Sequence, residues 1–272
     1  MRLRCDAKSG PVWRVYLEPG DKPAVMLDPP GVAELGALLT EAETAPSCRV
    51  LVFESTSASE FCRGMDLSFL VEHAGEDQSD TLLAHARCME QLRASSKTVI
   101  CVVDGEAVGG GVGLAAAADL VLASSRASIA LPECIFGLIP AIVLPILCER
   151  MPVQKVRALT ISGRKLSAAG AHSLGLVDEL VEDPDKLEST LRKVIKQLLR
   201  ISPRAVAQLK RFSAQLATTS RAQALELGAA QTAADLLEPD TIAALKAFHS
   251  GELPPHFERY RAPKTSKQES QA

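Results

Sequence analysis

The feature of this sequence that most constrains its fold is an apolar segment that leads, through a short connection, into three glycines and an alanine-rich segment. Residues 98–103, TVICVV, predict a β-strand, and residues 112–118, VGLAAAA, predict a helix. Between them lie the connection 104–108 and the glycines 109–111. Alternation of strands and helices is the signature of α/β folds, so this segment favours that class.

The same alternation extends to both sides of this segment. Further strands of the first half are predicted at residues 12–18, 49–54 and 119–123, and its helices at 31–45 and 81–94. Residues 71–80, VEHAGEDQSD, are acidic and polar and predict a mobile loop.

From residue 154 onward the pattern is mainly helical, with helices predicted at residues 185–199, 203–216 and 223–237. We therefore expect a core over residues 1–200 and a helical region over residues 201–260. The polar tail, residues 261–272, is expected to be disordered.

Composition excludes several classes of protein. The chain has 272 residues, of which 47% are hydrophobic and 23% charged, so it can bury a sizeable core. A net charge of −3 gives no general attraction to nucleic acid or to an anionic membrane. No apolar run approaches the roughly 18 residues of a membrane span, and residues 1–10 lack the apolar stretch of a signal peptide.

The cysteines and histidines predict neither a disulfide framework nor a metal site. The seven cysteines are odd in number, scattered, and without a CxxC pair, and the five histidines show no ligand spacing. We interpret the thiols as reduced groups in a cytoplasmic protein.

The glycines 109–111 admit three interpretations. They can simply allow a tight turn or close packing. Residues 111–116, GVGLAA, also fit the dinucleotide pattern GxGxxG/A, although that pattern should follow its strand at once. Finally, a helix that starts here presents free N–H groups to an oxygen that becomes negative during a reaction. The segment alone does not choose among them.

Two further segments decide the choice. Residues 61–66 read FCRGMD, residues 105–111 read GEAVGGG, and residues 131–140 read LPECIFGLIP. Their order and spacing resemble the crotonase (enoyl-CoA hydratase/isomerase) superfamily, whose pattern is F-x-x-G-x-D, G-x-x-x-G-G-G and P-E-x-x-x-G-x-x-P. The resemblance covers roughly residues 10–260. It implies an α/β fold, a crotonase-like ββα superhelix with a C-terminal helical trimerisation region.

The resemblance also implies the chemistry. In such enzymes two backbone N–H groups hold the thioester oxygen, and at these positions the chain has Met65 and Gly110. Loss of one such donor typically costs about 2.7–4 kcal/mol of transition-state stabilisation. Hydratases of the family usually have two glutamates. Here Gly113 stands at the first position, and Glu133 keeps the second. Ala130, Leu131 and the apolar residues after Glu133 are expected to raise its pKa.

A single carboxylate and the bulky apolar run 141–145, AIVLP, resemble the dehydratases of polyketide β-branching. This resemblance implies dehydration of 3-hydroxy-3-methylglutaryl on an acyl carrier protein to the 3-methylglutaconyl thioester. No cofactor is implied beyond the phosphopantetheine arm of carrier protein or coenzyme A. The implied assembly is a homotrimer or hexamer, without nucleic acid or membrane as a partner.

The remaining expected site residues adjoin the motif segments. The substrate-binding candidates are Cys62, Arg63, Gly64, Asp66, Gly109 and His85. Arg63 and His85 are candidates for the substrate's distal carboxylate, although a solvated charge and a helix-surface histidine explain them as well. Cys62 has no histidine partner in a motif, so packing is expected rather than covalent catalysis.

Four alternatives remain at this stage. A Δ3,Δ2-enoyl-CoA isomerase needs the same two donors and Glu133, and a general enoyl-CoA hydratase is also compatible with the superfamily. A 3-methylglutaconyl decarboxylase shares the donors but does not need a glutamate at position 133. A non-catalytic scaffold would have no reason to keep Glu133 beside both donor segments.

Overall fold

The computed structural model describes residues 1–6 and 8–260, and it divides into two compact units, residues 1–191 and the residues from 192 onward. Because the predicted tail, residues 261–272, lies outside the described residues, the expectation of disorder there stays a prediction.

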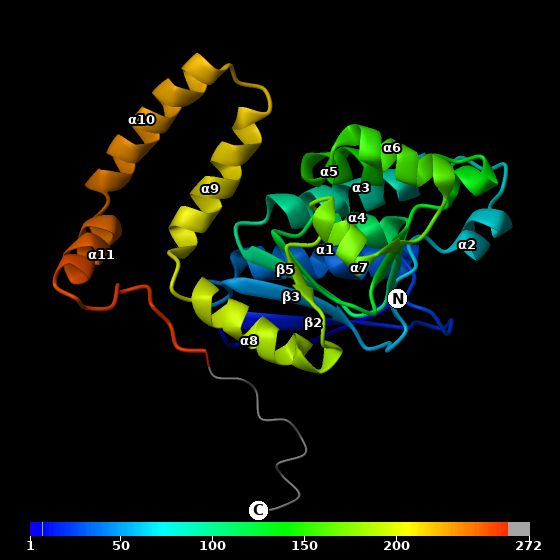
Figure 1. Cartoon of the computed structure of the whole chain (residues 1–272), viewed down its shortest axis with the longest axis horizontal. Coiled ribbons are helices and arrows are strands. Elements are labelled where there is room, and N and C mark those ends of the chain that lie inside the picture. Colours follow the sequence, from blue (N-terminus) through cyan, green and yellow to red (C-terminus); the bar gives the residue numbers. More distant parts are fainter. Residues whose placement is uncertain (7, 261–272) are drawn as a thin grey trace, which may run out of the picture. The chain divides into compact units, whose positions relative to one another are not determined.

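A six-stranded sheet runs through the first unit (Figure 1). In sheet order its strands are β1 (Arg2–Asp6), β2 (Val12–Glu18), β3 (Val50–Ser55), β5 (Thr98–Val103), β7 (Leu120–Ser124) and β10 (Glu179–Val181). Strand β1 is antiparallel to β2, and all other neighbours are parallel. All six residues of β5 are buried. This explains the continuous apolar run, since a central parallel strand is covered on both faces.

A second sheet of four short strands lies in the same unit. Its order is β4 (Glu60–Cys62), β6 (Glu106–Val108), β8 (Ser128–Ala130) and β9 (Leu166–Ser167). The first three strands are parallel, and β9 is antiparallel to β8. Each parallel strand of this sheet directly follows a strand of the six-stranded sheet in sequence. The chain therefore alternates between the two sheets as it winds.

Helices complete each turn of this winding. Those of the first unit are α1 (Pro29–Thr44), α2 (Leu67–Glu72), α3 (Ser79–Ala94), α4 (Gly110–Ala116), α5 (Val143–Arg150), α6 (Val153–Ser162) and α7 (Ala168–Ser173), with the short 3₁₀ helices η1 (Glu133–Phe136) and η2 (Pro184–Lys186). A strand of each sheet followed by a helix makes one ββα turn, so the predicted ββα superhelix is confirmed.

The hydrophobic core lies between the six-stranded sheet and helices α1, α3 and α4. Alternate residues of the strands, such as Leu51 and Phe53, join Leu39 of α1, Leu92 of α3 and Leu114 of α4 in one buried cluster. This packing fixes the start of α4, because that helix is itself wholly buried after its first residue.

The strand predicted at residues 98–103 matches β5, but the loop predicted at residues 71–80 is wrong at both ends. The first part, to Glu72, belongs to α2, which begins after Asp66 because the Asp66 carboxylate accepts a hydrogen bond from the Ser68 N–H. The last part belongs to α3, which starts at Ser79.

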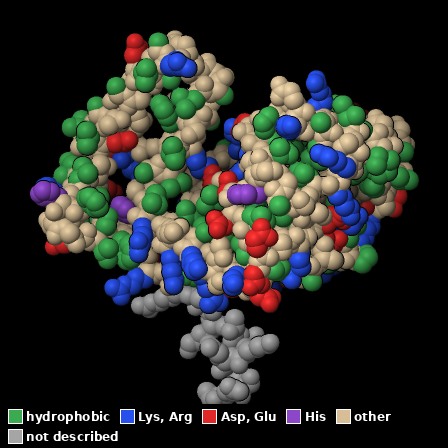
Figure 2. Space-filling view, viewed as in Figure 1, with side chains coloured by type: hydrophobic (Ala, Val, Ile, Leu, Met, Phe, Trp, Pro, Cys, Tyr) green, Lys and Arg blue, Asp and Glu red, His purple; other side chains and the backbone are tan. Residues whose placement is uncertain are grey.

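Helix α8 (Leu187–Leu198) spans the boundary between the units. In the second unit α9 (Pro203–Leu216), α10 (Arg221–Leu237) and α11 (Pro239–His249) follow. Among the described residues of these last three helices none is buried, and Figure 2 shows hydrophobic side chains spread over them. Within the described residues no helix is long and apolar enough to cross a membrane.

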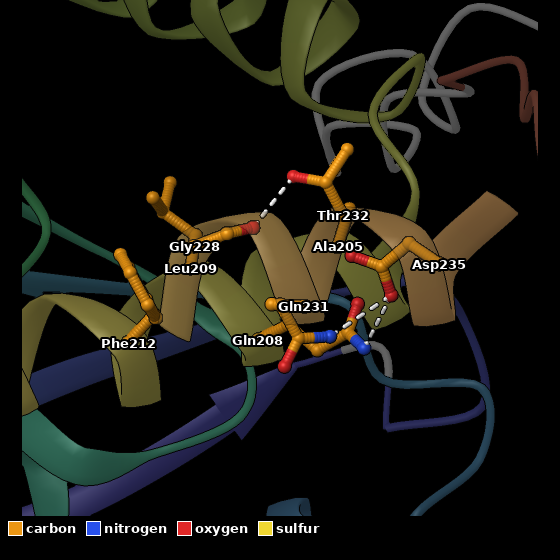
Figure 3. A pocket seen from close by; sticks show the side chains of 8 residues that line it. All are labelled: Ala205, Gln208, Leu209, Phe212, Gly228, Gln231, Thr232 and Asp235. Atoms are coloured by element: carbon orange, nitrogen blue, oxygen red, sulfur yellow. Dashed lines mark hydrogen bonds between the residues drawn. The ribbon is translucent and has the colours of Figure 1, made fainter. Parts of the chain in front are cut away.

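A shallow pocket lies between α9 and α10 (Figure 3). The Asp235 carboxylate accepts hydrogen bonds there from Arg204, Gln208 and Gln231. The pocket contains none of the residues that the sequence motifs single out, because those residues all belong to the first unit.

Candidate active site

The three motif segments leave the same edge of the four-stranded sheet. Strands β4, β6 and β8 are parallel neighbours, and residues 63–66, 109–111 and 131–133 follow their respective C-terminal ends. The carboxyl ends of parallel strands meet at one edge of a sheet, where ligands of α/β proteins usually bind. The sheet therefore brings together the segments that the sequence placed far apart.

Leu27 holds the first motif segment in place. Its N–H donates to the Gly64 carbonyl at 2.7 Å, and its carbonyl accepts from the Asp66 N–H at 3.4 Å. Met65 lies between these two bonds as the partner of Leu27 in an isolated parallel bridge. In a parallel bridge one residue uses its own N–H and C=O, while the residue opposite leaves its N–H unused. The Met65 N–H is thus turned away from Leu27.

The backbones of Gly64 and Gly110 lie in direct contact. A β-carbon added at Gly64 would lie 2.7 Å from the Gly110 nitrogen, and Gly64 also has a φ of +78°. A β-carbon added at Gly110 would lie 3.6 Å from the Met65 nitrogen. Any side chain at Gly64 would separate the two segments, so their approach depends on glycine.

The Met65 and Gly110 N–H groups remain available to a ligand. Among the hydrogen bonds of the described residues, neither N–H donates to another group of the chain, and both residues are only half-buried. Gly110 is the first residue of α4, where a helix leaves its N–H groups without intrahelical partners. Two neighbouring free donors at a helix start can hold one oxygen that carries negative charge.

The carboxyl group of Glu133 lies beside this pair of donors. Its Oε1 is 2.7 Å from where a β-carbon of Gly109 would stand, and Gly109 has a φ of +52°. Its Oε2 is buried and, within the described part of the chain, has no hydrogen-bond partner. Burial raises the pKa of Glu133 above its ordinary value. A carboxyl group with a raised pKa is suited to give and take a proton.

The surroundings of Gly113 are apolar. At Gly113, one turn into α4, a β-carbon would lie 3.0 Å from Cγ2 of Val143. Val143 is the first residue of α5 and is only 4% exposed. The position at which hydratases of the resembled superfamily usually have a second glutamate is therefore a glycine covered by a valine.

The Asp66 side chain is fixed by hydrogen bonds, and the Cys62 side chain is buried in the core. Burial alone would raise the pKa of Asp66, but hydrogen bonds from Lys22 and Ser68 outweigh it and lower that pKa to about 2. Burial raises the pKa of the Cys62 thiol to about 12, so the thiol stays protonated. The carbonyl of Cys62 lies so close to α4 that a β-carbon at Gly111 would be 2.1 Å from its oxygen.

Arg63 and His85 are engaged by other groups. The Arg63 guanidinium donates to the Glu106 carboxylate at 2.9 Å and lies 3.9 Å from the Glu60 carboxylate. The His85 ring is buried, with Nδ1 3.1 Å from the Thr81 carbonyl and Nε2 3.4 Å from the carbonyl of Leu27. His85 thus packs against the backbone of Leu27, which holds residues 63–66 in place. It is not a histidine on a helix surface.

Sequence reasoning missed two residues of this site. Leu27 lies just before Asp28-Pro29-Pro30, the segment that departs from the family pattern, so no motif marks it. Val143 belongs to the apolar run 141–145, but only the fold shows that its side chain covers Gly113. Within the described residues no group of three or more His, Cys, Asp or Glu side chains is arranged to hold a metal ion.

Comparison with known proteins identifies the family of this chain. The family model described as enoyl-CoA hydratase/isomerase matches residues 22–253. The chain belongs to this family. It is a hydro-lyase of the enoyl-CoA hydratase type, and members of the family act on acyl thioesters.

Individual relatives agree on the class of reaction. Carnitinyl-CoA dehydratase of Proteus mirabilis is 32% identical over 181 residues, which cover 65% of this chain and 67% of the relative. The bacillaene synthase dehydratase PksH of Bacillus subtilis is 31% identical over 203 residues, covering 74% and 76%. An enoyl-CoA hydratase/isomerase from Marinobacter aquaeolei superposes with a TM-score of 0.84 at 28% identity over 94% of this chain and 99% of that one.

The raised pKa of Glu133 gives a prediction about stability. A carboxyl group whose pKa is higher in the folded chain destabilises the fold once it ionises. Stability therefore falls as pH rises from the unfolded value, about 4.3, through the folded pKa. Glu133→Gln removes this penalty, so its melting temperature should exceed that of the wild type at pH 8, with a difference that shrinks toward pH 4.5.

Thermal melts followed by circular dichroism between pH 4.5 and pH 8 measure this difference. The exposed Glu182 provides the matched control, because Glu182→Gln should melt with the wild type throughout. A Glu133→Gln variant that is no more stable than the wild type at pH 8 would contradict the assigned burial of the carboxylate.

Proposed function

We propose that this hydro-lyase eliminates water from a 3-hydroxyacyl thioester, with Glu133 as the sole proton-transferring side chain. The observation that supports this proposal best is the buried Oε2 of Glu133, which has no partner among the described residues and lies beside two free backbone donors. An unpartnered buried oxygen is costly, and such groups are typically kept for function.

The reaction would proceed through a thioester enolate. The N–H groups of Met65 and Gly110 hold the thioester oxygen while the Glu133 carboxylate removes the proton from C2. The electron pair of the C2–H bond forms the enolate, with its charge on the thioester oxygen. When the enolate collapses, that pair forms the C2=C3 double bond and the C3–O bond breaks. Glu133 returns its proton to the departing hydroxyl, which leaves as water. One carboxylate serves both steps if the C2 proton and the hydroxyl lie on the same face of the substrate.

The finer proposal concerns the acyl group. We propose 3-hydroxy-3-methylglutaryl as the substrate, because the apolar contact of Val143 with Gly113 leaves a single carboxylate beside the donors and because PksH, a dehydratase of bacillaene synthase, is among the relatives. The second candidate is a 3-hydroxyacyl-CoA of another kind, which the carnitinyl-CoA dehydratases among the relatives support.

The acyl carrier is also part of the proposal. A carrier protein is acidic and would be attracted by local basic charge. The side chains of Lys193 and Lys196 on α8, and of Arg200 just after it, are exposed at a spacing that puts them on one side of the helix.

Mass spectrometry of the acyl group tests this function. Incubation of the wild type with 3-hydroxy-3-methylglutaryl on carrier protein should remove one water, more efficiently than with the same group on coenzyme A. The Glu133→Gln variant should lose about 10²- to 10⁴-fold in rate, as expected for loss of a general acid–base group, whereas Glu182→Gln should retain activity.

The alternatives give different products in the same assay. Water loss from carnitinyl-CoA or 3-hydroxybutyryl-CoA alone would replace the branched substrate by the second candidate. A moved double bond in a 3-enoyl thioester without water loss would indicate an isomerase. Near-normal activity of Glu133→Gln would refute the mechanism itself.

Association through the C-terminal helices is a further part of the proposal. Leu209, Leu225, Leu237 and Phe248 are all more than half exposed, and apolar surface of this extent usually meets a partner. A closed trimer or a dimer of trimers would cover it. Light scattering should therefore give a mass of three or six chains, and a monomer at micromolar concentration would contradict the proposed assembly.

A further inference from the structure

The proposed mechanism assigns no role to Val143. Its side chain packs on Gly113 of α4, where a β-carbon would lie 3.0 Å from Cγ2, 3.6 Å from Cγ1 and 3.7 Å from Cβ of the valine. Glycine inside a helix costs about 1 kcal/mol relative to alanine, so its presence here needs a packing reason. The valine supplies it, because both of its methyl groups approach the helix backbone.

The valine is held firmly in this place. Its N–H donates to the Pro140 carbonyl at 3.0 Å, and the Leu144 N–H donates to the same oxygen at 2.9 Å. The side chain is 4% exposed and belongs to the buried cluster that also contains Leu114 and Leu147. A side chain that its backbone and its neighbours hold in one position can limit the size of a group that packs against it.

Val143 meets α4 one helical turn beyond the donor Gly110. Gly113 follows the donor Gly110 by three residues, which is roughly 4.5 Å along the helix axis and on nearly the same side. With the thioester oxygen on the Gly110 N–H, C3 is two bonds beyond the thioester carbon. Glu133 lies at Gly109 instead, so the Glu133 carboxylate stands at the start of this turn and Val143 at its end.

We propose that Val143 is a specificity-determining residue that packs against the substituent on C3 and selects acyl thioesters with a small apolar branch there. This inference rests on the proposed elimination of water only for the choice of substrates. The methyl groups of Val143 provide an apolar contact for a methyl branch, and its volume excludes a longer one.

The ratio of kcat/KM for substrates with and without the branch measures this selectivity. The wild type should prefer 3-hydroxy-3-methylglutaryl-CoA to 3-hydroxyglutaryl-CoA, which lacks the branch. In Val143→Ala the ratio of the two kcat/KM values should fall about tenfold, the usual order for one methylene-sized contact, and the 3-ethyl analogue should become a better substrate. Val143→Ile should instead lower kcat/KM for the 3-methyl and 3-ethyl substrates.

A matched control separates specificity from stability. Val156 on α6 is fully buried in the same cluster, so Val156→Ala should lower the melting temperature as Val143→Ala does but leave the substrate ratio unchanged. An unchanged ratio in folded Val143→Ala and Val143→Ile would overturn the proposal, as would an equal change in Val156→Ala.

Binding measurements keep this test independent of the proposed reaction. In the Glu133→Gln background, calorimetric titration gives dissociation constants for the branched and unbranched thioesters without turnover. Adding Val143→Ala should reduce the preference for the branched thioester about tenfold. If the wild type removes water from neither substrate, the proposed function fails, whereas the ratio of dissociation constants still decides the role of Val143.

Discussion

The site depends on how closely the backbones of neighbouring segments approach one another at the edge of the four-stranded sheet. Gly64 lies against Gly110, and the Cys62 carbonyl lies against Gly111, in each case with no space for a β-carbon. These contacts set the Met65 nitrogen beside the start of α4. Because the proposed donors are backbone atoms, one held by a bridge to Leu27 and one at the start of a buried helix, their geometry is as rigid as the core around them.

The same edge of the sheet carries the Glu133 carboxylate, whose burial costs free energy. Burial raises the pKa of the Glu133 carboxyl group, whose Oε2 lacks a partner among the described residues, so ionisation of this group costs stability. The fold tolerates this penalty because the six-stranded sheet and its helices bury a large core. Asp66 is the contrast, since hydrogen bonds from Lys22 and Ser68 keep it ionised and fixed as the cap of α2.

Long apolar runs and ordered motifs were predictable from the sequence, whereas contacts between distant segments were not. Strand β5 is predictable because six buried residues follow one another. The strands of the second sheet have two or three residues, too few for any periodicity. Arg63 was a candidate for the substrate's carboxylate, but its partner Glu106 lies 43 residues away in sequence, so only the fold reveals that ion pair.

In the proposed mechanism the Met65 and Gly110 N–H groups polarise the thioester oxygen. Isotope-edited infrared spectroscopy of a thioester labelled with ¹³C at C1 and bound to Glu133→Gln observes that oxygen directly, because the variant prevents turnover. Two hydrogen bonds to the oxygen weaken the C=O bond, so its stretching frequency should fall on binding, relative to the free thioester in water. A bound carbonyl with the same or a higher frequency would contradict it.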